Sequence, residues 1–193
     1  MSYSKKPVRA VGGRLVLDFL NTADWSEDGQ VIHEKLATPE DVLTWTNAIG
    51  ITQSVMAHHA PDLGALREMR GHLRALVLAA MHGDHLQWQV RRALTRLFEG
   101  GSQAHLRETI TQDLHSVIES SLTGIILTSA KALLFDPREI ARIKKCAGPR
   151  CGWLFVDESR NGRRRWCSME TCGNRAKARR FHEHKSKPQP DAD

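Results

Sequence analysis

Two stretches of the chain carry clear helical patterns. The longer one follows Pro61 and Asp62, and its apolar residues recur on a single stripe: Leu63, Leu66, Leu73, Leu76, Val77 and Ala80. The other begins at residues 38–41, Thr-Pro-Glu-Asp, which supply an N-cap, a proline at the first helical position and an acid at the third. That helix would end at Gly50 and bury three residues, Val42, Trp45 and Ile49.

Weaker patterns complete the outline of the first 137 residues. Helical spacing of apolar residues predicts further helices over 52–59, 86–98 and 117–134, and a brief helix after Asp136-Pro137. Residues 31–36 and 105–111 are strand candidates, whereas 14–21 fits either a strand or one buried helical turn. The predicted fold is mainly α with minor β, an α+β body of helices ahead of a small C-terminal module.

The apolar runs also bear on location. The longest, residues 124–135, is short of the roughly 18 apolar residues of a membrane helix and is broken by Thr128, Ser129 and Lys131. The N-terminal lysines are not followed by the apolar run of a signal peptide. We therefore expect a cytoplasmic protein with no membrane-spanning segment.

Charge is distributed unevenly along the chain. Residues 1–137 contain 13 Lys and Arg against 15 Asp and Glu, a net of −2. Residues 138–187 contain 15 Lys and Arg against 5 Asp and Glu, a net of +10. A near-neutral body that carries a strongly basic end indicates a partner rich in phosphate.

The four cysteines predict a metal site. They occur near the C-terminus with the spacing Cys146-x4-Cys151-x15-Cys167-x4-Cys172, and none occurs before them. Two short-spaced pairs of this kind supply a tetrahedral zinc site, and a cytoplasmic location argues against disulfides. Iron–sulfur ligation is the alternative, and the two-pair spacing favours zinc. Four protein ligands leave no open position, so one structural Zn²⁺ is expected.

The residues between and after the cysteine pairs predict a hairpin followed by a helix. Residues 153–156, Trp-Leu-Phe-Val, form a strand candidate, Asn161-Gly162 a turn, and 163–166 the return strand. A helix should begin near Gly173 and pack against the hairpin through Asn174, Ala178 and Phe181. Knuckle, hairpin and helix in this order describe a treble-clef-like zinc module.

Basic residues of this module are candidates for contacting nucleic acid. On the return strand, alternation would send Arg163 and Arg165 to one side and Arg164 to the other. On the helix, the outward-pointing set would be Arg175, Lys177, Arg179 and Arg180. Arginine binds both phosphates and guanine edges, so we predict double-stranded DNA as the partner.

The C-terminal segment resembles a known family. The segment Cys172-Gly-Asn-Arg175, with the cysteines around it, resembles the motif for which the CGNR zinc finger is named, over about residues 142–182. Gly12-Gly13 and residues 17–22, Leu-Asp-Phe-Leu-Asn-Thr, resemble the ABATE domain that precedes this finger. That family is described as candidate stress-induced bacterial transcription regulators. The resemblance implies DNA binding through the finger and sensing of a small-molecule effector by the body.

The sequence therefore predicts an ABATE-like helical domain over 1–137, a zinc module over 138–185 and a disordered tail over 186–193, with a body that folds independently. No nucleophile elbow, triad or phosphate-binding loop is present, so we expect no enzyme. Two alternatives remain: a zinc-stabilised protein-interaction module, and a small-molecule-binding body that the finger anchors. Asp18 and Asn21, inside an apolar segment, would brace the backbone or line a ligand pocket.

Overall fold

The computed structural model describes residues 7–51, 62–83, 121–149 and 151–185. The helices expected over 52–59 and 86–98, the strand over 105–111 and the tail lie outside these ranges. In chain order the body contains α1 (Leu15–Leu20), β1 (Ala23–Trp25), β2 (Val31–Glu34), α2 (Pro39–Ala48), α3 (Leu63–Met81), α6 (Leu122–Phe135) and α7 (Pro137–Ile140). The C-terminal module contains β3 (Ile143–Lys145), β4 (Leu154–Val156), a single π-helical turn η4 (Met169–Gly173) and α8 (Asn174–Lys185).

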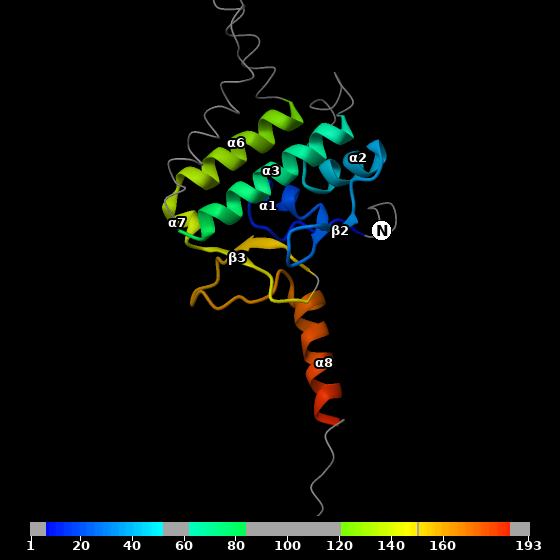
Figure 1. The fold of residues 1–193 in the computed structure, drawn as a ribbon, viewed down its shortest axis with the longest axis vertical. Coiled ribbons are helices and arrows are strands. Elements are labelled where there is room, and N and C mark those ends of the chain that lie inside the picture. The colour runs from blue at the N-terminus through cyan, green and yellow to red at the C-terminus, as the bar shows by residue number, and fades with distance from the viewer. Residues whose placement is uncertain (1–6, 52–61, 84–120, 150, 186–193) are drawn as a thin grey trace, which may run out of the picture.

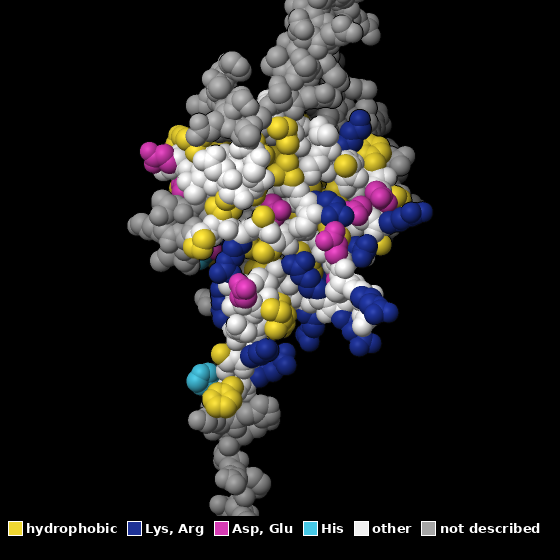
Figure 2. Space-filling model, turned by 180° about the vertical axis from the view of Figure 1, so that it is seen from behind, with side chains coloured by type: hydrophobic (Ala, Val, Ile, Leu, Met, Phe, Trp, Pro, Cys, Tyr) yellow, Lys and Arg dark blue, Asp and Glu magenta, His cyan; other side chains and the backbone are white. Residues whose placement is uncertain are grey.

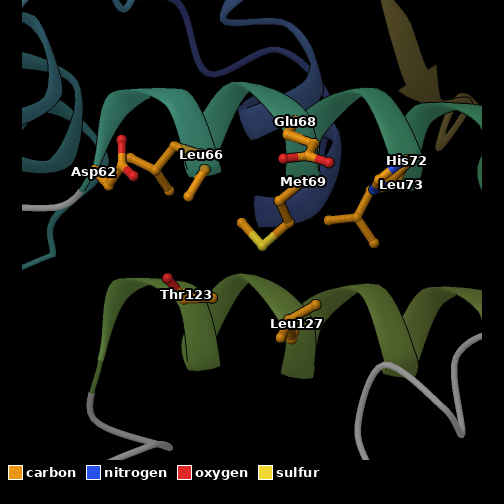
Figure 3. Close-up of a pocket in the computed structure, with 9 residues that line it drawn as sticks. Asp62, Leu66, Glu68, Met69, His72, Leu73, Thr123 and Leu127 are labelled. Atoms are coloured by element: carbon orange, nitrogen blue, oxygen red, sulfur yellow. The ribbon is translucent and has the colours of Figure 1, made fainter. Parts of the chain in front are cut away.

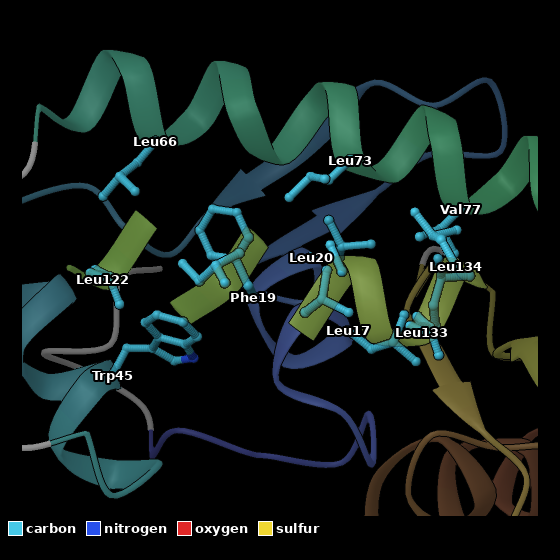
Figure 4. Close-up of a cluster of buried hydrophobic side chains, with 14 of the residues drawn as sticks. Leu17, Phe19, Leu20, Trp45, Leu66, Leu73, Val77, Leu122, Leu133 and Leu134 are labelled. Carbon is cyan, nitrogen blue, oxygen red and sulfur yellow. The ribbon is translucent and has the colours of Figure 1, made fainter. Parts of the chain in front are cut away.

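The body is a helical layer over the buried helix α1. Helices α3 and α6 lie side by side, α1 packs beneath both, and the antiparallel pair β3–β4 lies under α1 (Figure 1). Leu66 and Leu73 of α3 point toward Phe19 and Leu20 of α1, and Val77 lies beside Leu134 of α6 (Figure 4). The predicted stripe of α3 is thus the face that makes the core, and the mainly helical fold with minor strand content is confirmed.

The start of α2 follows the predicted capping signal, and α3 starts after Pro61-Asp62 as predicted. Thr38 Oγ1 accepts a hydrogen bond from the Asp41 amide at 3.2 Å, and the Asp41 carboxylate accepts from the Thr38 amide at 2.9 Å. This capping box satisfies donors that the first turn of a helix leaves free. Asp62 caps α3 by accepting a hydrogen bond from the Gly64 amide at 2.8 Å. Gly50, with a φ of +78°, follows the last turn of α2, as predicted.

The ambiguous segment 14–21 is a helix. Its residues Val16 to Leu20 are all buried, so no polar face existed to reveal a helical period. The strand predicted at 31–36 is β2, which pairs antiparallel with β1 through Ala23 opposite Glu34. Among the described residues, no helix is both long and apolar enough to cross a membrane.

The predicted hairpin of the zinc module is wrong in its pairing. The turn forms at Ser159–Gly162, but residues 163–166 are not a strand, and β4 pairs with β3 instead. The other edge of β4 is already occupied, because Asn21 bonds to the Leu154 backbone and the Gly12 carbonyl accepts from the Val156 amide. Segment 163–165 therefore docks on the cysteine knuckle, where the Arg165 carbonyl accepts from the Ala147 amide at 3.0 Å.

The predicted packing of the last helix is also wrong. Asn174, Ala178 and Phe181 are all exposed, Phe181 by 59%, and α8 projects away from the rest of the molecule (Figure 1). Its main packing neighbour is η4 at its own N-terminus. The helix is strongly basic and has too few apolar residues to form a buried stripe.

The body and the zinc module share one hydrophobic core. Ile143, Leu154 and Val156 belong to the same buried cluster as α1, α3 and α6. Polar contacts cross the same boundary, because Arg74 of α3 donates to the Gly152 carbonyl at 2.8 Å and the Trp153 indole donates to the Ala23 carbonyl at 3.0 Å. Because of this shared packing, we propose that residues 1–137 and the zinc module unfold together rather than independently.

Candidate metal centre and nucleic-acid interface

The four cysteines converge on one point. Their sulfur atoms lie within 4.8 Å of one another, and all four residues are buried. The sulfur of Cys167 is 3.7 Å from those of Cys151 and Cys172. Tetrahedral zinc with Zn–S bonds of about 2.3 Å requires sulfurs roughly 3.8 Å apart. These separations fit zinc and exclude disulfides among the four, which are free thiols here.

The knuckle between Cys146 and Cys151 is built for close approach to the sulfurs. The amides of Gly148 and Cys167 donate to the Cys146 sulfur at 3.4 and 3.3 Å. A Cβ at Gly148 would lie 2.9 Å from the Cys172 sulfur, so a larger residue would push into the metal site. A Cβ at Gly152, whose φ is +62°, would lie 2.6 Å from the Trp25 carbonyl oxygen of the body.

The electrostatics of the cluster call for a cation. Hydrogen bonds from Cys151, Cys167 and Cys172 hold the pKa of the Cys146 thiol far below its ordinary value. The interaction with Cys146 in turn raises the pKa of Cys151 and Cys167 well above theirs. The pKa values of two thiols are thus raised, so the four do not ionise together without a cation, whereas zinc binds all four as thiolates.

Two tryptophans cover the metal site. Trp153 is buried and Trp166 half-buried, and both pack in the cluster formed by the four cysteines and Phe155. The indole of Trp153 also donates to Asp24 Oδ1 at 2.9 Å. Trp153 is therefore engaged by the body.

Arg164 is an internal brace. Its guanidinium donates to the carbonyls of Val11 at 2.9 Å and Cys167 at 2.6 Å, and stacks 4.2 Å from the Phe155 ring centroid. Arg163 and Arg165 on either side of it are exposed, and no strand forms there. With its donors engaged inside the protein, Arg164 does not belong to an exposed basic face.

The other six candidate residues are exposed on the zinc module. Lys and Arg side chains gather over the lower part of the molecule, where this module and α8 lie (Figure 2). The exposed candidates are Arg163, Arg165, Arg175, Lys177, Arg179 and Arg180. None of them forms an ion pair with a carboxylate within the part of the chain that the structure describes.

A hollow joins α8 to the knuckle and reveals a residue that the sequence did not single out. Lys145 and Arg179 both line it, together with Ser26 and Glu27 from the turn after β1, and its volume is about 440 Å³. Lys145 lies at the end of β3 and is exposed. In the sequence Lys145 stands out only by its position next to Cys146, which does not indicate that it lies near Arg179 of α8.

The body contains a groove between α3 and α6. Leu66, Met69 and Leu73 point from α3 toward Thr123 and Leu127 of α6 (Figure 3), and the groove measures about 370 Å³. Asp18 and Asn21 do not line it. Asp18 accepts from the Gly12 amide at 2.8 Å and Asn21 bonds to Leu154, so both brace the backbone.

Two family models match the chain. Residues 142–185 match the CGNR zinc finger. Residues 13–137 match ABATE, described as "putative stress-induced transcription regulator". The chain belongs to the ABATE family. Neither description is of an enzyme, and no curated protein matches the chain. The finger match and the clustered cysteines together establish one structural zinc site in this ABATE protein.

Proposed function

We propose that this ABATE protein regulates transcription by binding duplex DNA through its zinc module. The observation that carries the proposal is that the exposed basic residues of the module lack carboxylate partners among the described residues. Arg14 and Arg70 of the body, in contrast, form ion pairs, Arg14 with Glu139 and Glu158 and Arg70 with Glu34. The six basic residues on the outer side of the module have no carboxylate partner in the described chain.

The arrangement of these cations suits a phosphate backbone. Arg163 and Arg165 lie on a segment fixed to the knuckle, and Arg175 and Arg179 are one helical turn apart on α8. The zinc site holds η4, from which α8 starts, through Cys172. Cations held at fixed separation bind a regular charge array better than cations on a flexible tail do, because less conformational entropy is lost. The hollow with Lys145 and Arg179 extends this face toward the body.

The test is the salt dependence of binding to mixed-sequence duplex DNA. Each phosphate contact contributes a log–log slope of about −0.9, so six contacts would give roughly −5. The double variant R163A/R165A should reduce the magnitude of this slope by about 2 while one zinc per chain is retained. Arg164→Ala is unsuitable because it removes an internal brace.

Two control variants separate charge from geometry. R163K/R165K keeps the charges and should keep the slope, while any preference for guanine contacts weakens. Arg138→Ala removes one exposed charge from α7 in the body and should leave the slope unchanged. If the wild-type protein shows no salt-sensitive binding at low ionic strength, the module serves protein interaction instead. The exposed Met169 and Phe181 would then be its first candidates.

A further inference from the structure

Arg74, a buried arginine of the body, extends toward the zinc site. Arg74 of α3 is only 3% exposed, donates to the Gly152 carbonyl at 2.8 Å, and lies 4.3 Å from the ring centroid of Trp25. Gly152 directly follows the zinc ligand Cys151. The guanidinium therefore reaches from the helical body to the backbone of the metal knuckle.

Arg74 has no carboxylate partner in the described part of the chain. Its Nε and Nη1 atoms are buried and have no hydrogen-bond partner there. Arg70, one turn earlier on the same helix, forms an ion pair with Glu34. A buried cation without an anion is strongly unfavourable, so a compensating negative charge should lie nearby.

The zinc site supplies that charge. Four thiolates around one Zn²⁺ carry a net charge of −2, in a cluster of buried residues. We propose that Arg74 is the counter-cation of this zinc–thiolate centre, and that zinc occupancy thereby controls the stability of the helical body. The inference concerns metal binding and is independent of the nucleic-acid role.

Burial supports this assignment, because it lowers the pKa of Arg74 to about 10 and no described carboxylate offsets that shift. Lys35 differs, because burial also lowers its pKa but its ammonium pairs with Asp24. Arg74 is therefore the buried cation that lacks a carboxylate of its own among the described residues.

A charge-pairing role predicts how zinc affinity responds to substitution. Zinc affinity of the full chain is measured by competition with a chromophoric chelator. R74M should lower the affinity by roughly 10–100-fold, the range for groups that support metal ligands from outside the coordination sphere. R74K keeps the charge and should stay within a few-fold of wild type. R74Q keeps a donor for Gly152 but loses the charge, and should resemble R74M.

The matched control is Arg67→Met. Arg67 lies on the same helix and also donates to a backbone carbonyl, that of Leu36 at 2.7 Å, which is outside the zinc knuckle. Its loss should leave zinc affinity unchanged. If R74Q binds zinc like wild type, or R74K loses affinity as R74M does, Arg74 is a hydrogen-bonding brace and the proposal is overturned.

A second measurement separates charge pairing from packing even where a variant binds zinc poorly. Chelation removes the fixed zinc–thiolate charge of −2 and leaves Arg74 a buried cation with less counter-charge. R74M should therefore have a lower unfolding midpoint than wild type with zinc bound, and a higher one after chelation. The same lowering in both states would overturn the proposal. Hydrogen exchange of α3 should show the same reversal in the body itself.

Discussion

Asn21→Ala tests whether the body and the zinc module are one cooperative unit. The Asn21 side chain is 1% exposed, donates to the Leu154 carbonyl and accepts from the Leu154 amide, both at 2.9 Å. Leu154 lies in β4, and these two bonds cover the edge of β4 opposite to β3. The substitution leaves one buried donor and one buried acceptor unsatisfied. At about 1–3 kcal/mol for each group, the free energy of unfolding should fall by about 2–6 kcal/mol.

The assay follows each region separately during urea unfolding. Far-UV circular dichroism reports mainly the body helices, and zinc release to a chromophoric chelator reports the module. In the wild type the two transitions should coincide, and in the variant both should shift together. In a thermal scan the midpoint should drop by roughly 4–24 °C, from about 2–4 °C per kcal/mol for a chain of this size. Asn47→Ala, at an exposed position of α2, should change stability by less than about 0.5 kcal/mol.

One outcome would contradict the shared core. If Asn21→Ala lowers the midpoint of zinc release while the helical transition stays where it was, the two regions unfold separately. The division at residue 137 would then be a true folding boundary, as the sequence suggested.

Three further predictions concern local features. Cys167→Ser should abolish stoichiometric zinc binding, measured by elemental analysis; retention of one zinc per chain would contradict the four-cysteine site. Burial raises the pKa of Asp18 to about 6 from an ordinary value near 3.8. The folded state therefore binds a proton more tightly than the unfolded state, and stability should fall by up to about 3 kcal/mol as pH rises from 4 to 6. The difference in unfolding free energy between wild type and Asp18→Asn should change over this window, and a pH-independent difference would refute the assignment. Thr38→Ala removes the N-cap of α2 and should cost about 1 kcal/mol in urea unfolding, whereas the exposed Thr44→Ala should not.

Features that depend on neighbours in sequence were predictable. The caps at Thr38 and Asp62 need only residues two or three positions away. The stripe of α3 is a local period, and the cysteine spacing reflects the short reach of each knuckle. Helix α1 is an exception. It is buried on every side, so its sequence shows no alternation of apolar and polar residues that would indicate a helix.

Features that depend on distant partners were not predictable. Asn21 and Leu154 are 133 positions apart, and Arg74 and Gly152 are 78 apart. The predicted hairpin failed for this reason. Asn161-Gly162 forms its turn as local chemistry dictates, but the edge of β4 is occupied by residues of the body. Likewise, Arg164 looks like a surface cation in sequence, and only the structure brings the Val11 carbonyl to it.

Helix α8 shows how a wrong packing prediction can inform function. Asn174, Ala178 and Phe181 have the spacing of a packed face, yet the helix buries none of them. An isolated helix of about 12 residues is marginal in water, because nucleation outweighs the gain from so few hydrogen bonds. The zinc-held turn η4 supplies that nucleus. Helix α8 starts from a rigid metal site, projects from the body and carries arginines that have no carboxylate partner among the described residues, so it is poorly explained as part of a core. On the function that we propose, its stabilising contacts would come from an anionic partner.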